Sequence, residues 1–244
     1  MKKLFITLLA SLFPVLALAA GGGVHLDKAG IDPTDQESLQ RGARLFVDSC
    51  LSCHSAKFMR YNRMAADLGI DEQTLISEYM VAVEKPGDTM RVAMTDEMAK
   101  QWFGTKIPDL SLVARSRGID WLYTYLRSFY VDEKRPFGVN NAVFNGVSMP
   151  HVMWELQGWQ KAVFKTGPDG KATDQIEKLE LVTPGSMSTA EFDTAMRDLV
   201  NFLSYVGEPI QNTRRELGIW VMGFLVIFFV VAYLLKKEYW RDIH

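Results

Sequence analysis

A run of 19 residues without a charged side chain, residues 217–235, constrains the fold of this chain more than any other feature. As an α-helix rising about 1.5 Å per residue, the run is about 28 Å long, close to the ~30 Å hydrocarbon core of a bilayer. A core helix of a soluble domain usually keeps a polar stripe, and this run has none. We therefore expect one transmembrane helix over residues 217–235, preceded by a short polar hinge at residues 210–216.

A second apolar segment lies at the N-terminus. Lys2 and Lys3 precede an apolar run that is interrupted by Pro14 and followed by the small-x-small pattern Ala17-Leu18-Ala19. This order is typical of a secretory signal peptide, and the run is too short for a membrane anchor. Residues 1–20 are therefore predicted to be a signal peptide that exports the rest of the chain.

The charges around the apolar run indicate its orientation. Lys236, Lys237 and Arg241 follow it directly and favour a cytoplasmic C-terminus, whereas Arg214 and Arg215 on the other side weaken that bias. The export signal decides between the two orientations, so we expect residues 21–209 in the periplasm. The tail, residues 236–244, is then cytoplasmic, and the protein crosses the bacterial inner membrane once.

The only two cysteines lie in the motif Cys50-Leu51-Ser52-Cys53-His54. Two thiols separated by two residues and followed by a histidine form the c-type haem attachment pattern, in which each thiol adds to a haem vinyl group and the histidine binds the iron. The alternative is a thiol-disulfide redox pair, which would need a βαβ context that the neighbouring sequence lacks. The motif therefore predicts one covalently bound haem.

A methionine sulfur is a common second axial ligand in electron carriers of this kind. Met149 lies at the end of an irregular stretch, residues 137–150, that is rich in Gly and Asn and is stiffened by Pro150. A loop of this kind can hold a side chain over a flat macrocycle. On sequence alone the other candidates are Met94, Met98, Met153 and Met187.

Helical periodicity dominates the part of the chain between the two apolar ends. A capping box of Thr34 and Glu37 begins a helix that leads to Cys50, and Ser188 with Glu191 begins a closing helix. Further helices are expected over residues 71–83, 95–103 and 119–129, and the turn at 167–171 predicts a small β excursion. The expected class is mainly α: a cytochrome c-like haem domain with loop insertions, plus the transmembrane helix.

Two arginines follow the stiff turn that Pro108 and Asp109 predict. Arg115 and Arg117 are one residue apart on a helical turn, so they cannot both face the same partner. One of them can pair with a haem propionate, or both are ordinary surface arginines.

Taken in order, these motifs resemble the cytochrome c1 family, the haem-bearing subunit of ubiquinol-cytochrome c reductase, the cytochrome bc1 complex. The resemblance covers nearly the whole mature chain, and it rests on the haem motif, on Pro108-Asp109-Leu110-Ser111, on Gly146-Val147-Ser148-Met149-Pro150 and on Gly207-Glu208-Pro209 before the anchor. It implies thioether links at Cys50 and Cys53, axial ligation by His54 and Met149, and a propionate contact from Arg115.

The resemblance also implies a role in electron transfer. The chain would take one electron from the Rieske iron-sulfur protein to its haem c and pass it to a soluble cytochrome c, as a redox subunit that is no enzyme in isolation. Its partners would be cytochrome b and the Rieske subunit in a dimeric complex. The alternative is a membrane-anchored haem subunit of another periplasmic oxidase or peroxidase.

The net charge agrees with this role. It is −2, or −4 once Lys2 and Lys3 are removed with the signal peptide. No basic run lies in the middle of the chain, so nucleic-acid binding is not expected. The negative charge weakly favours docking of a basic carrier.

Overall fold

The computed structural model describes residues 25–81, 83–167 and 172–243, and the predicted signal peptide lies outside them. The described part is mainly helical with small strand pairs, which confirms the predicted fold class. The longer helices are α2 (Gln36–Ser49), α3 (Tyr61–Leu68), α5 (Asp96–Phe103), α7 (Ile119–Arg127), α9 (Thr189–Gly207) and α10 (Gln211–Tyr239). The short ones are α4 (Glu72–Thr74), the π-helix η1 (Leu75–Tyr79), α6 (Val113–Arg117), α8 (Trp154–Gln157) and the 3-10 helix η2 (Arg241–Ile243).

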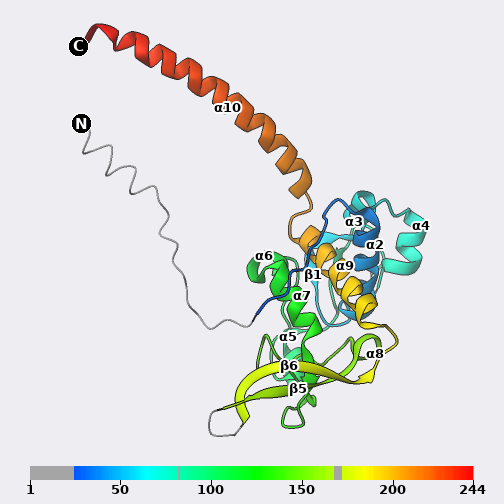
Figure 1. The fold of residues 1–244 in the computed structure, drawn as a ribbon. Helices are drawn as coiled ribbons and strands as arrows, with labels where there is room; N and C mark the ends of the chain where they lie inside the picture. Colours follow the sequence, from blue (N-terminus) through cyan, green and yellow to red (C-terminus); the bar gives the residue numbers. More distant parts are fainter. Residues whose placement is uncertain (1–24, 82, 168–171, 244) are drawn as a thin grey trace.

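The core of the folded domain forms where α2 crosses α9 (Figure 1). The rings of Phe46 and Phe202 lie 5.5 Å apart at this crossing, and both side chains are buried. Gly42 lies in α2 where the backbone of α9 comes so close that a side chain would not fit. The first and the closing helix therefore hold each other in place, and the C-terminal end of α2 carries the cysteine motif.

The helix starts agree with the sequence in one case and differ in another. Ser188 and Glu191 form the expected capping box of α9. At α2 the cap is Asp35, whose side chain accepts a hydrogen bond from the N–H of Ser38, so the prediction of Thr34 was wrong. The Thr34 hydroxyl instead donates to Asp32 at 2.6 Å, because a short side chain in a turn also bonds within the turn.

Three antiparallel strand pairs lie among the helices of the described part. They are β1 (Ala56–Arg60) with β2 (Thr89–Met90), β3 (Phe129–Val131) with β4 (Val139–Asn141), and β5 (Gly158–Thr166) with β6 (Ala172–Pro184). The β5–β6 pair is the expected β excursion, and it projects at the end of the domain far from α10 (Figure 1). Of the predicted turn at 167–171, only Gly167 lies within the described residues.

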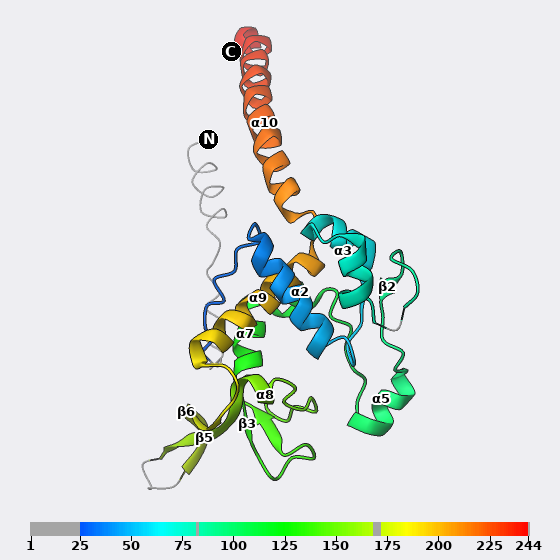
Figure 2. The same cartoon turned by 90° about the vertical axis from the view of Figure 1, so that its right-hand side faces the viewer.

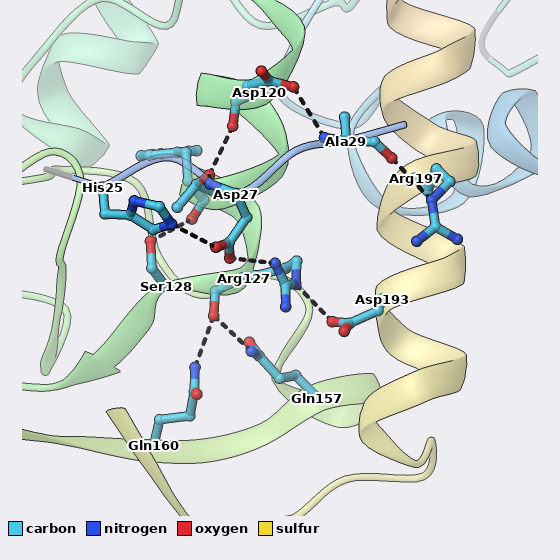
Figure 3. Close-up of polar contacts among 12 residues, drawn as sticks. His25, Asp27, Ala29, Asp120, Arg127, Ser128, Gln157, Gln160, Asp193 and Arg197 are labelled. Atoms are coloured by element: carbon cyan, nitrogen blue, oxygen red, sulfur yellow. Dashed lines mark hydrogen bonds and ion pairs between the residues drawn. The ribbon is translucent and has the colours of Figure 1, made fainter. Parts of the chain in front are cut away.

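The segment that precedes α2 is fastened to α7 and α9 by polar contacts (Figure 3). The N–H groups of Asp27 and Ala29 donate to side chains of α7, at 2.8 Å and 2.9 Å. Arg127 bridges two carboxylates, Asp27 at 2.7 Å and Asp193 of α9 at 2.6 Å. This segment is therefore part of the folded domain.

Helix α10 leaves the domain as one continuous helix of 29 residues (Figures 1 and 2). It is long and apolar enough to cross a membrane, and its apolar side chains are exposed. The helix begins at Gln211, so residues predicted as a polar hinge form its first turns. The amide of Asn212 donates to the carbonyl of Pro33 at 3.1 Å, which ties this end of the helix to the domain.

Candidate haem site

The cysteine motif forms a tight turn directly after α2. Cys50 caps the helix with its N–H on the carbonyl of Phe46, and the N–H groups of Cys53 and His54 both donate to the carbonyl of Cys50, at 3.1 Å and 2.8 Å. Both thiols are free, Cys50 buried and Cys53 partly exposed. The two sulfurs thus come from one turn, as two bonds to one macrocycle require.

The Cys50 thiol is unlike that of a redox dithiol. Burial raises the pKa of Cys50 to about 12, with a smaller contribution from Cys53. Reactive dithiols depend on a thiolate whose pKa is lowered by nearby positive charge or a helix N-terminus. Cys50 lies instead at the C-terminal end of α2, so its environment argues against the thiol-disulfide alternative.

His54 is oriented by a backbone carbonyl. Its Nδ1 lies 2.8 Å from the carbonyl oxygen of Pro108, which can only accept, so Nδ1 carries the hydrogen. The lone pair is then on Nε2, and this arrangement is the one that metal-binding histidines use. Burial lowers the pKa of His54, while Pro108 and Asp109 act in the opposite direction. The neutral ring that a metal needs is therefore favoured.

The turn that presents this carbonyl is bonded to the chain just after the motif. A side-chain oxygen of Asp109 accepts the N–H of Lys57 at 3.0 Å, and the N–H of Leu110 donates to the carbonyl of Ser55 at 2.7 Å. The stiff turn expected at Pro108 and Asp109 thus fixes the histidine ring. Sequence alone gave no reason to pair the two segments, which are more than 50 residues apart.

Met149 lies in the loop between β4 and α8, partly buried beside a small cluster of Phe129, Val139 and Val147. Its sulfur accepts a hydrogen bond from the hydroxyl of Tyr125 at 3.3 Å. Tyr125 was not among the residues predicted for the site, because in the sequence it is one of several aromatic residues in the helical stretch 119–129.

The rival methionines have other environments. Met153 is 2% exposed and belongs to the main core, and Met187 packs against that core. Met98 lies on the surface of α5, whereas Met94 lines a cavity of about 290 Å³ together with Cys53. The choice of Met149 as ligand stays a prediction.

The two arginines point to different partners, as their spacing predicted. The Arg115 side chain is 61% exposed, lies 3.9 Å from Glu208 and lines a cavity of about 420 Å³ beside the start of α10. The guanidinium of Arg117 lies over the ring of Trp121 at 5.1 Å, and Trp121 stacks on Tyr125. Arg117 therefore lies beside the stacked pair of Trp121 and Tyr125, whose tyrosine donates to Met149. The propionate contact of Arg115 stays a prediction.

The donor set fits a covalently attached haem: two free thiols from one turn, an oriented neutral histidine and a thioether that lies in an ordered loop. Together with a terminal helix able to span a membrane, it defines the class of membrane-anchored c-type cytochromes.

Comparison with known proteins gives the family. The sequence model of the Cytochrome C1 family matches residues 28–243. The chain is 50% identical to cytochrome c1 of Allochromatium vinosum over the full length of both chains, and 48% identical to the ammonia monooxygenase gamma subunit of Nitrosomonas europaea over 98% of each. It is also 26% identical to cytochrome b/c1 of Bradyrhizobium diazoefficiens, over 86% of this chain and 34% of that protein. The chain belongs to the cytochrome c1 family.

Membership identifies the chain as an electron-transport protein and a redox subunit of a larger complex. The family implies covalent haem c, a membrane anchor and a place in the cytochrome bc1 complex.

Proposed function

We propose that this chain takes one electron from the Rieske iron-sulfur protein and passes it to a soluble cytochrome c. The contact between His54 and the carbonyl of Pro108 carries the proposal, because it leaves Nε2 free for a metal beside two free thiols. Bound haem would supply a one-electron iron couple. In the proposed site Cys50 and Cys53 would hold the haem covalently, and His54 and Met149 would bind its iron.

The proposed ligand set explains why such a chain would transfer electrons and leave substrates unchanged. With His54 and Met149 both bound to the iron, no coordination site would remain for a small molecule. Arg115 is retained as the proposed propionate contact.

We also propose the orientation in the membrane. Residues 21–209 lie in the periplasm, α10 crosses the inner membrane once, and Lys236, Lys237 and Arg241 hold the C-terminus in the cytoplasm. The anchor would keep the haem close to the Rieske donor and to cytochrome b, within a dimeric complex.

The ligand set is tested by substitution in the full-length holoprotein. Met149→Leu keeps covalent haem, because Cys50 and Cys53 are untouched, but it removes the sulfur-to-iron absorption band and lowers the reduction potential. Met98→Leu, on the surface of α5, is the matched control and leaves both unchanged. An unaltered band in Met149→Leu would show that another methionine is the ligand.

A second candidate function is a redox subunit of another membrane oxidase. The 48% identity to a protein named as an ammonia monooxygenase subunit favours it. Purification after mild detergent extraction separates the two functions. Cytochrome b and a Rieske protein in the purified complex support the bc1 assignment, whereas an oxidase in their place supports the second.

A further inference from the structure

We propose that Tyr125 is a positioning residue that acts through Met149, and that its hydroxyl raises the reduction potential of the haem by donating a hydrogen bond to the Met149 sulfur. The inference rests on the proposed function, in which Met149 binds the iron. Under this proposal a residue of α7, which lies outside the haem-binding motifs, helps to set the reduction potential.

The geometry lets the sulfur serve both partners. The Tyr125 hydroxyl lies 3.3 Å from Sδ of Met149. A thioether sulfur has two lone pairs, so one could bind iron while the other accepts the hydrogen bond from the hydroxyl. A phenol hydroxyl is protonated at neutral pH and can donate this hydrogen bond.

The Tyr125 ring is held from two sides. It stacks on Trp121 with centroids 4.9 Å apart and planes 9° apart, and Phe129 meets it edge-on at 5.2 Å. The side-chain amide of Asn141 in β4 donates to the backbone carbonyl of Tyr125 at 2.8 Å. The hydroxyl is therefore placed by the packing of its ring against two aromatic neighbours and by a backbone hydrogen bond to β4.

The Met149 loop is fixed as well. The side-chain oxygen of Asn140 accepts the N–H of Gly146 at 2.9 Å, and Arg135 donates to the carbonyls of Gly146 and Val147 at 2.7 Å and 3.3 Å. Gly146 has φ +79°, in the left-handed region where a side chain would be strained. Since both the donor and the acceptor are anchored, the contact is a built feature of this fold.

The direction of the effect follows from the charge on the iron. A hydrogen bond to the ligand sulfur withdraws electron density from it. The sulfur then donates less electron density to the iron, which destabilises the ferric state more than the ferrous state. The reduced form is therefore favoured while the hydroxyl is present. Removing the hydroxyl should shift the equilibrium toward the oxidised form.

The test is a redox titration of the full-length holoprotein with Tyr125→Phe, which keeps the ring and removes only the hydroxyl. We expect the reduced-to-oxidised ratio at a given applied potential to fall severalfold, up to about tenfold, and tenfold corresponds to 59 mV for a one-electron couple. The sulfur-to-iron band persists. The control is Tyr123→Phe on the same helix, whose ring lies against Arg127 and Arg197 and whose potential should not change.

A double-mutant cycle shows whether the effect passes through the sulfur. In a Met149→Leu background, Tyr125→Phe should leave the potential unchanged. An unchanged potential in the single Tyr125→Phe variant, or an equal fall in the Met149→Leu background, would overturn the inference. A sulfur-to-iron band that survives Met149→Leu would instead show that the proposed ligand is wrong, so the two failures can be told apart.

Discussion

Gly42 is the position where one added methyl group should do the most damage to the fold. A Cβ there would lie 2.0 Å from the backbone oxygen of Asp198 and 2.8 Å from Cβ of Phe202, both on α9. To reach an ordinary contact of 3.4 Å the two helices would have to separate locally by about 1.4 Å. The obstacle is backbone, so it cannot rotate away as a flexible side chain could.

The cost of Gly42→Ala can be estimated from two opposing effects. Overpacking against atoms that cannot move away lies at the upper end of its usual range, about 3 kcal/mol. Alanine regains about 1 kcal/mol over glycine in a helix interior. We therefore expect the free energy of unfolding to fall by about 2 kcal/mol. Because Cys50 is the C-cap of α2, the displacement should also disturb the candidate haem site.

The assay is denaturant unfolding of the holoprotein, followed by haem absorbance and by far-UV circular dichroism. Gly87→Ala is the matched control, because a Cβ at Gly87 would meet nothing within 4 Å, and its free energy of unfolding should change by less than about 0.5 kcal/mol. If Gly42→Ala unfolds at the same denaturant concentration as the parent protein, α2 and α9 do not approach each other as closely in solution as they do in the structure, and the reasoning is refuted.

Two further predictions concern polar contacts outside the proposed ligand set. Arg127→Gln breaks the bridge between Asp27 and Asp193, in which both hydrogen bonds join charged groups. We expect the free energy of unfolding, measured by denaturant titration, to fall by about 1.5 to 3 kcal/mol. An unchanged midpoint would refute this. Burial, assisted by a hydrogen bond to Asp67, raises the pKa of Tyr205 above its ordinary value of 10. As pH rises, the unfolded chain therefore loses this proton before the folded protein does, and the free energy of unfolding should fall above about pH 10. Tyr205→Phe should weaken that dependence between about pH 9 and pH 11, and an equal slope in both proteins would contradict it.

Local chemistry made several features predictable from sequence. The helices over residues 95–103 and 119–129 and the closing helix follow from apolar periodicity, and α5, α7 and α9 lie there. The helix predicted over residues 71–83 is shorter in the structure. It ends at Tyr79 as a π-helix, and Met80 is already extended, so the predicted end was wrong. Periodicity reports which side of a segment is apolar, and it is a poor guide to where the segment ends.

The sequence by itself determined the cysteine motif, the apolar anchor and the family, because each is recognised from short motifs and their order along the chain. Tertiary structure alone decided the contacts of His54 with Pro108, of Tyr125 with Met149 and of Gly42 with Asp198. Each joins segments at least 24 residues apart, and hydrophobic patterns do not say which partner covers a given face. The motif that predicts haem attachment can thus be read along the chain, whereas the groups that orient His54 and Met149 are brought together only by folding.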